Sequence, residues 1–271
     1  MNDSVDFAAI RDVQQKTWSE GDFAMVANLV SMPSEQLAES LEIIPGERVL
    51  DVACGSGNAA LAAARRAWGN TVGVDFVPAL LERGRERAAA ERLEVEFLEG
   101  DATALPVGDA EFDVVTSIYG AMFAADQEKA AAELLRVCKP GGRIGMGNWS
   151  PEGAVGGMFM TVAKHAPPPP GVKPPLRWGT EDGLHELLGD DVSDLRIERR
   201  ISRQPFRSAD HYIDFFRTYF GPVKVAFERV GEEGEEALEK DLREYLAGAN
   251  TGGDKALVLE AEYLEVIATR A

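Results

Sequence analysis

Short apolar runs alternate with helical stretches through the middle of the chain. The apolar positions switch between compact runs of five or six residues and a spacing near 3.6, which is the pattern of strands followed by helices. Strands that alternate with helices are joined by right-handed crossovers, so the pattern predicts an α/β fold with a mostly parallel sheet. The expected strands are residues 48–52, 71–75, 94–98, 112–117 and 143–148, and the expected helices between them are residues 58–68, 78–92 and 127–138.

The segment before the first strand has helical spacing throughout. It predicts helices over residues 3–18 and 23–30, and a third that begins at Pro33-Ser34 and ends at Pro45-Gly46. We interpret residues 1–46 as a helical cap over the first strand and residues 47–271 as the main domain.

The rhythm changes after Trp149. Glycines and prolines over residues 151–179 predict a surface loop, and the aromatic helix expected over 208–220 should end at Gly221-Pro222. Because a strand interrupts this region, we interpret 151–194 and 205–250 as an insertion that forms a helical lid after strand five. The remaining elements are expected as helices at 180–188 and 232–247 and strands at 195–201 and 257–268.

The composition excludes several classes of partner. The chain has 271 residues and a formal net charge of −18, which disfavours nucleic acid because phosphate backbones would be repelled. We expect no membrane span, because no apolar run approaches the roughly 20 residues that a span needs. The acidic start, Met1–Asp6, lacks a secretion signal, and the two cysteines form no disulfide framework, so a cytoplasmic location is expected.

An acid directly precedes a glycine turn at the end of the first strand. Asp51 comes before Gly55 and Gly57, and Asp75 and Asp101 end or follow the next two strands. The carboxyl ends of parallel strands form the ligand-binding edge of such a sheet. Three carboxylates suit a metal in type, but the glycines suit a nucleoside better, and no metal is expected. The acids match a ligand with a cationic amino acid end, a ribose and an adenine. A nicotinamide dinucleotide would instead place pyrophosphate near Asp51.

Five segments carry a further signal by their order and spacing: Val49–Gly57, Val72–Asp75, Gly100–Pro106, Phe112–Ser117 and Leu134–Gly142. In this order they resemble the successive motifs of class I S-adenosylmethionine-dependent methyltransferases. The resemblance covers residues 45–150 and is nearest the small-molecule branch that includes the ubiquinone and menaquinone C-methyltransferases. It implies a Rossmann-like sheet of seven strands with the last strand antiparallel.

The resemblance also implies roles for individual residues toward S-adenosylmethionine. Asp51, Gly55 and Gly57 would hold the methionine part, and Asp75 would bind the ribose hydroxyls. Around the adenine and sulfonium, the implied contacts come from Phe76, Asp101, Ala102 and Ser117, and the cap implies a further contact from Trp18.

The sulfonium methyl of that cofactor is already activated, so the protein's main task is to align the acceptor and exclude water. The expected acceptor is a small, largely apolar organic molecule, and His211 in the aromatic helix is the candidate base where a proton must leave. Two alternatives stay open: a regulatory protein that binds S-adenosylmethionine without turnover, and an NAD(P)-dependent oxidoreductase. Expected pocket residues are Tyr119, Met122, Phe123, Trp149 and Tyr212.

Overall fold

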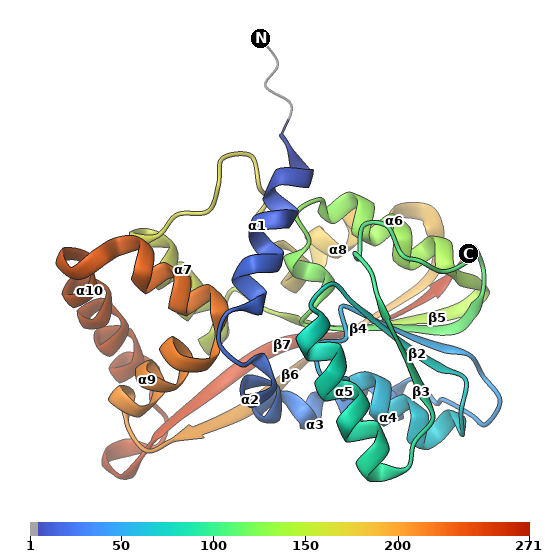
Figure 1. The fold of residues 1–271 in the computed structure, drawn as a ribbon, viewed down its shortest axis with the longest axis horizontal. Coiled ribbons are helices and arrows are strands. Elements are labelled where there is room, and N and C mark those ends of the chain that lie inside the picture. Colours follow the sequence, from blue (N-terminus) through green and yellow to red (C-terminus); the bar gives the residue numbers. More distant parts are fainter. Residues whose placement is uncertain (1–4) are drawn as a thin grey trace.

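A single seven-stranded sheet forms the centre of the molecule in the computed structural model, which describes residues 5–271 (Figure 1). The strand order is β3-β2-β1-β4-β5-β7-β6. Met1–Ser4, which include the first two residues of the predicted helix 3–18, lie outside the described residues. The strands are β1 (Val49–Val52), β2 (Thr71–Asp75), β3 (Val95–Glu99), β4 (Phe112–Ile118), β5 (Cys138–Trp149), β6 (Val192–Phe206) and β7 (Leu257–Arg270).

The first five strands are parallel, and β7 runs antiparallel to both of its neighbours, β5 and β6. The predicted Rossmann-like sheet with an antiparallel last strand is therefore confirmed. Strands β1 and β2 are buried at every position, which explains why they read as unbroken apolar runs. The strand expected over residues 143–148 is longer than predicted, because β5 already begins at Cys138.

Helices cover both faces of the sheet. Figure 1 shows α3, α4 and α5 on one side and α6 and α8 on the other, as the crossover rule requires. Both cysteines are free and buried, as small apolar side chains would be. The helices named here are α3 (Ser31–Ser40), α4 (Asn58–Ala67), α5 (Pro78–Glu91), α6 (Gln127–Val137) and α8 (Glu181–Leu188).

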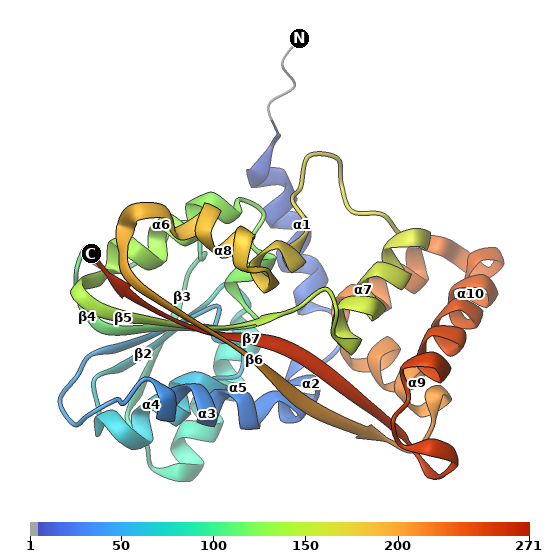
Figure 2. The same cartoon turned by 180° about the vertical axis from the view of Figure 1, so that it is seen from behind.

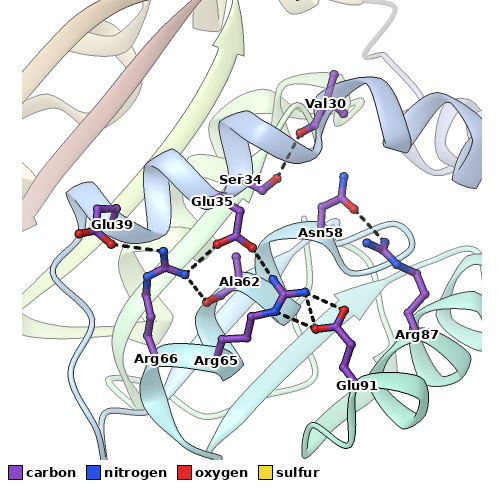
Figure 3. Close-up of polar contacts among 10 residues, drawn as sticks. All are labelled: Val30, Ser34, Glu35, Glu39, Asn58, Ala62, Arg65, Arg66, Arg87 and Glu91. Carbon is purple, nitrogen blue, oxygen red and sulfur yellow. Dashed lines mark hydrogen bonds and ion pairs between the residues drawn. The ribbon is translucent and has the colours of Figure 1, made fainter.

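The N-terminal segment forms α1 (Phe7–Ser19), α2 (Phe23–Ala27) and α3. Ion pairs hold α3 against α4 (Figure 3): Glu35 pairs with both Arg65 and Arg66, and Arg65 also pairs with Glu91 of α5. Helix α1 has no fully buried residue and runs between the sheet and the helices of the insertion. Its position depends on contacts with the loops at the edge of the sheet and with the start of the last α-helix, α10 (Gly221–Ala249).

One stretch of the insertion that was expected as a loop is a helix. Residues 154–165, expected within a surface loop, form α7 (Ala154–His165). The glycines that suggested a loop are there because the packing is close. A Cβ on Gly156 would overlap with the carbonyl oxygen of Ser150, and one on Gly157 would overlap with the Tyr245 ring.

Strands β6 and β7 continue past the sheet as a two-stranded ribbon (Figure 2). The β5 pairing ends at Trp149 opposite Tyr263, whereas β6 and β7 stay paired out to Phe206 opposite Leu257. The far end of the ribbon carries α9 (Ala209–Tyr219) and α10 (Gly221–Ala249). Helix α9 ends at Tyr219, so the stop expected at Gly221-Pro222 is confirmed to within one residue. The same two residues begin α10, where proline is tolerated in the first turn, and Gly231 interrupts that helix with a φ of 66°.

Candidate active site

A cavity of about 230 Å³ lies at the carboxyl edge of the parallel strands. Its floor is formed by the segments that follow β1, β2, β3 and β4, and its cover by α1 and α2. This is the edge at which open α/β sheets bind ligands. Of the residues expected in the site, the structure brings nine to this cavity: Trp18, Asp51, Gly55, Asp75, Phe76, Asp101, Ala102, Tyr119 and Phe123.

Asp51 is the last residue but one of β1, and it is almost fully buried, at 2% exposed. Its Oδ2 accepts the backbone N–H of Ala60 at 2.9 Å, in the first turn of α4, and its Oδ1 accepts the hydroxyl of Thr116 at 3.0 Å. Burial raises the pKa of Asp51 from 3.8 to about 7, because the charged form loses its water, and the two hydrogen bonds offset only part of that effect. A cationic group in the cavity would restore the charged carboxylate.

The glycine turn connects Asp51 with the second acid. Gly55 has a φ of 53°, and its backbone N–H donates to Oδ2 of Asp75 at 2.8 Å. Gly57 has a φ of 84°, and a Cβ there would come within 3.0 Å of the Phe97 ring. Gly55 lines the cavity. Gly57 lies outside the lining, and its missing side chain allows α4 to pack closely on Phe97 of β3.

Asp75 is 5% exposed and anchors both the turn after β1 and the turn after β2. Besides Gly55, it accepts the N–H of Val77 on Oδ1 at 2.9 Å. Burial raises the pKa of Asp75 to about 6, and the backbone N–H donors partly counter the effect. This acid therefore shapes the turn as well as facing the cavity.

The third acid is more open than the other two. Oδ1 of Asp101 accepts the N–H of Thr103 at 2.8 Å, and its side chain is 20% exposed. Arg11 of α1 reaches to 3.9 Å from Oδ2 of Asp101. The carbonyl of Phe76 accepts a hydrogen bond from Gln15, also of α1. The helix is thereby attached to the loops that follow β2 and β3.

One face of α1 covers the cavity. Phe7, Arg11, Gln14 and Trp18 recur at intervals of four and three residues and all line it. Gln14 also donates to the carbonyl of Phe123 at 3.0 Å. Sequence reasoning selected only Trp18 from this face, although the i, i+4, i+7, i+11 spacing would have grouped the four.

Aromatic side chains form one wall of the cavity. Trp18 lies edge-on to Phe23 and Phe123, with ring centroids 5.5 and 5.2 Å away. Phe220, at the start of α10, packs against the same indole at 5.5 Å from outside the cavity. The wall therefore joins the N-terminal cap to the insertion.

The end of β4 is held in a strained conformation. Tyr119 has a φ of 52° and stacks on Trp149 with ring centroids 3.7 Å apart. Ala53, at the end of β1, also has a φ of 52°, and a Cβ on Gly120 would come within 2.7 Å of it. Such left-handed conformations are rare away from glycine and cluster at functional sites. Sequence reasoning missed Ala53 and Gly120, because neither carries a reactive group.

Five other expected residues lie outside the cavity lining in the part of the chain that the structure describes. Ser117 is part of β4, where its buried hydroxyl donates to the carbonyl of Val52 and accepts the N–H of Ala121. His211 is on α9, where Nδ1 accepts the N–H of Arg207. The ribbon carries α9 beyond the sheet, which gives a physical reason for its distance from the strand ends. The three that complete the set are fully or almost fully buried: Met122, Trp149 and Tyr212.

Comparison with known proteins identifies the chain. A family model described as a methyltransferase domain matches residues 49–142. An uncharacterized protein of Mycobacterium tuberculosis is 39% identical over 256 residues, covering 93% of this chain and 92% of the relative. A demethylmenaquinone methyltransferase of Thermus thermophilus is 50% identical over 106 residues, which are 39% of this chain and 48% of that enzyme. The chain is a class I S-adenosylmethionine-dependent methyltransferase.

Solved structures agree on the fold of this methyltransferase. The YcgJ protein of Bacillus subtilis superposes with a TM-score of 0.63 and 21% identity, over 88% of this chain and 98% of that one. Membership of this family removes the oxidoreductase alternative. In the described range no helix has the length and apolar character that crossing a bilayer requires. Among residues 5–271, no three His, Cys, Asp or Glu side chains are grouped as metal ligands.

The cavity of the methyltransferase fits its cofactor in chemical type. S-adenosylmethionine carries an amino acid end, a sulfonium, a ribose and an adenine, and it has no phosphate. The cavity offers carboxylates at three successive strand ends and a backbone turn free of bulky side chains. The buried Asp51, whose pKa is raised by the loss of water around its charged form, is the group that a cationic ligand would satisfy.

Proposed function

We propose that this methyltransferase transfers the methyl group of S-adenosylmethionine to a small, largely apolar organic acceptor by direct in-line displacement. One arrangement carries the proposal: the acids at three strand ends meet in a single cavity whose cover presents the aromatic rings of Phe7, Trp18 and Phe23 beside two polar side chains of α1. The cofactor, when bound, supplies a methyl group already activated by its sulfonium. The chain's own residues bind, orient and exclude water.

The acids divide the work of holding the cofactor. Asp51 pairs with the cationic amino acid end, and Gly55 lets the backbone approach it closely. Asp75 accepts the ribose hydroxyls with the lone pairs left free by Gly55 and Val77. At the other end, Asp101 and the backbone of Ala102 meet the adenine amino group, and Phe76 packs on the ring. The strand positions and the burial of these residues support the assignment.

The aromatic wall favours an apolar acceptor. Trp18, Phe23 and Phe123 keep water from the space next to the strand ends, and their ring faces favour a methyl group that carries partial positive charge in transit. The matched region of the demethylmenaquinone methyltransferase spans about half of that enzyme, so its named acceptor type is one member of a test panel.

The transfer itself needs no covalent nucleophile, and a base only where the acceptor must lose a proton. His211 lies outside the cavity lining, and its Nδ1 is already engaged by a backbone N–H. We therefore leave His211 out of the proposed mechanism. Because the site excludes water, an acceptor that has lost its proton before it binds is the class that this site suits.

Two measurements test the function. Calorimetric titration with S-adenosylhomocysteine and with NAD⁺ should show binding of the former alone. Incubation with methyl-labelled S-adenosylmethionine and a panel of hydroquinones, phenols, amines and carboxylic acids should transfer label into an apolar acceptor.

Other outcomes would contradict parts of the proposal. Label appearing only in highly polar acceptors would overturn the acceptor class. Binding of S-adenosylhomocysteine with no product from any acceptor would instead favour a regulatory protein without turnover. No binding at all would overturn the site.

A further inference from the structure

Arg87 of α5 differs in its contacts from the arginines around it. Arg65 and Arg66 of α4 pair with carboxylates on the surface. Arg87 is half-buried and turns toward uncharged oxygens of the glycine turn. Figure 3 shows Arg87 pointing at Asn58, beside the ion pairs of Arg65 and Arg66.

The guanidinium holds the turn from behind. Nη1 of Arg87 lies 2.7 Å from the carbonyl oxygen of Ser56 and 3.2 Å from its hydroxyl. Ser56 is 2% exposed and sits between Gly55 and Gly57, both of which have positive φ. Ser56 also lines the cavity, so the contact places Arg87 one residue away from the space where the cofactor binds.

The same nitrogen connects the turn to the cap. Nη1 of Arg87 lies 2.8 Å from Oδ1 of Asn58. This contact orients the Asn58 amide so that Nδ2 donates to the carbonyl oxygen of Ala27 at 2.8 Å. Ala27 ends α2, and both Asn58 and Ala27 line the cavity.

We propose that Arg87 is a positioning residue for the cofactor, which fixes the turn through Ser56 and, through Asn58, fixes α2 of the cap over the same cavity. The inference rests on the proposed function, because it takes this cavity as the cofactor site. One cation thereby sets both the floor and part of the cover.

The chemistry suits an arginine in this position. A guanidinium remains charged when partly buried, although burial lowers the pKa of Arg87. Hydrogen bonds to a charged donor are stronger than neutral ones. All of these contacts are made by Nη1, whose two N–H groups have fixed directions in the guanidinium plane. A lysine ammonium also carries several N–H donors, but it rotates freely and would hold the two acceptors in a less fixed geometry.

The test compares Arg87→Gln with Arg83→Gln. Arg83 lies one helical turn earlier on α5 and pairs with Glu86 on the surface, so it is a matched control. Arg87→Gln should weaken S-adenosylhomocysteine binding about tenfold, the effect expected from loss of a charge-assisted contact. Arg83→Gln should bind as the wild type does. Arg87→Lys, a milder change, should fall between the two.

Hydrogen exchange in the ligand-free protein supplies a second readout. Arg87→Gln should speed exchange of the α2 amides while the central strands keep their protection. Asn58→Ala should speed α2 exchange to the same extent, and the double variant should add little, because both changes break one chain of contacts.

The two kinds of failure are distinguishable. Wild-type binding by Arg87→Gln, together with unchanged α2 exchange, would overturn the inference even if Asp75→Asn still weakened binding. Absence of S-adenosylhomocysteine binding in the wild type would instead overturn the proposed site. Additive effects of Arg87→Gln and Asn58→Ala on α2 exchange would overturn the link to the cap.

Discussion

The hydroxyl of Thr116 donates to Oδ1 of Asp51 at 3.0 Å, between residues that are direct partners in the β1–β4 pairing. Both side chains are buried at 2% exposure, and the hydrogen bond lowers the pKa of Asp51 against the larger effect of burial. Thr116, which has no expected role in the chemistry, thus holds the acid that is expected to meet the cofactor's cationic end.

Replacing Thr116 with valine keeps the shape and removes the hydroxyl. The buried acceptor on Asp51 loses a partner, which should cost about 1–3 kcal/mol of unfolding free energy, measured by urea denaturation. The pKa of Asp51 should rise further, so binding of S-adenosylhomocysteine should require a higher pH. Thr116→Ser, which restores the donor, should return the pH profile toward that of the wild type; an identical profile for Thr116→Val would refute the role of the hydroxyl.

Cofactor binding should weaken as the pH falls through about 7. Asp51 has a pKa of about 7 in the free protein, and only its charged form attracts a cationic ligand group. Titrations with S-adenosylhomocysteine between pH 5.5 and 8.5 should show affinity falling up to tenfold for each pH unit below the midpoint. Asp51→Asn should bind weakly and lose most of this dependence. A flat wild-type profile would remove the ion pair from the mechanism.

The same buried carboxylate should lower stability as the pH rises. The folded state binds the Asp51 proton more tightly than the unfolded state, because the folded pKa is raised from 3.8 to about 7. Between these values the folded state holds more protons, so this contribution to the free energy of unfolding falls as the pH increases. The difference between Asp51→Asn and wild type, measured without ligand, should therefore grow in favour of the variant from pH 4 to pH 7.5.

Asp75 should be tested with asparagine in preference to alanine. Alanine would leave the N–H groups of Gly55 and Val77 without their acceptor, so lost binding would mix with a distorted turn. An asparagine side chain cannot accept on both positions, but it keeps the volume and one oxygen. Asp75→Asn should weaken S-adenosylhomocysteine binding by about tenfold or more with unfolding still cooperative. Unchanged affinity would remove Asp75 from the site.

Two glycines of α10 should respond in opposite ways to alanine. A Cβ on Gly221 would overlap with the Thr17 carbonyl oxygen, where the end of α1 packs on the start of α10. A Cβ on Gly248, at the other end of α10, meets nothing within 4 Å. Gly221→Ala should destabilise the chain by about 1–3 kcal/mol. Gly248→Ala should leave stability unchanged or raise it by up to about 1 kcal/mol. Thermal unfolding of both variants distinguishes these outcomes.

Alternating periodicity and the residues at strand ends were enough to predict the parallel core and the meeting of three acids. Asp51, Asp75 and Asp101 converge because parallel strands place their carboxyl ends at one edge, whatever the rest of the chain does. The sequence also carried the methyltransferase motifs, which lie within this locally determined region.

The region after Trp149 was harder to predict, because its conformation depends on distant partners. Gly156 and Gly157 suggested a loop, yet they belong to α7. They are glycines because Ser150 and Tyr245 leave no room for a Cβ at these positions. His211 and Tyr212 were expected at the site, yet they lie outside the cavity lining on a helix carried away by the β6–β7 ribbon.

The sequence by itself therefore determined the sheet, the turn and the acids, because strand period and turn chemistry act over a few residues. Only the tertiary structure decided which side chains cover the cavity. Arg11 and Gln14 reach it, and Arg87 holds its turn, through contacts between segments far apart in the chain. Such contacts depend on packing angles and on the length of the ribbon, which no local pattern encodes.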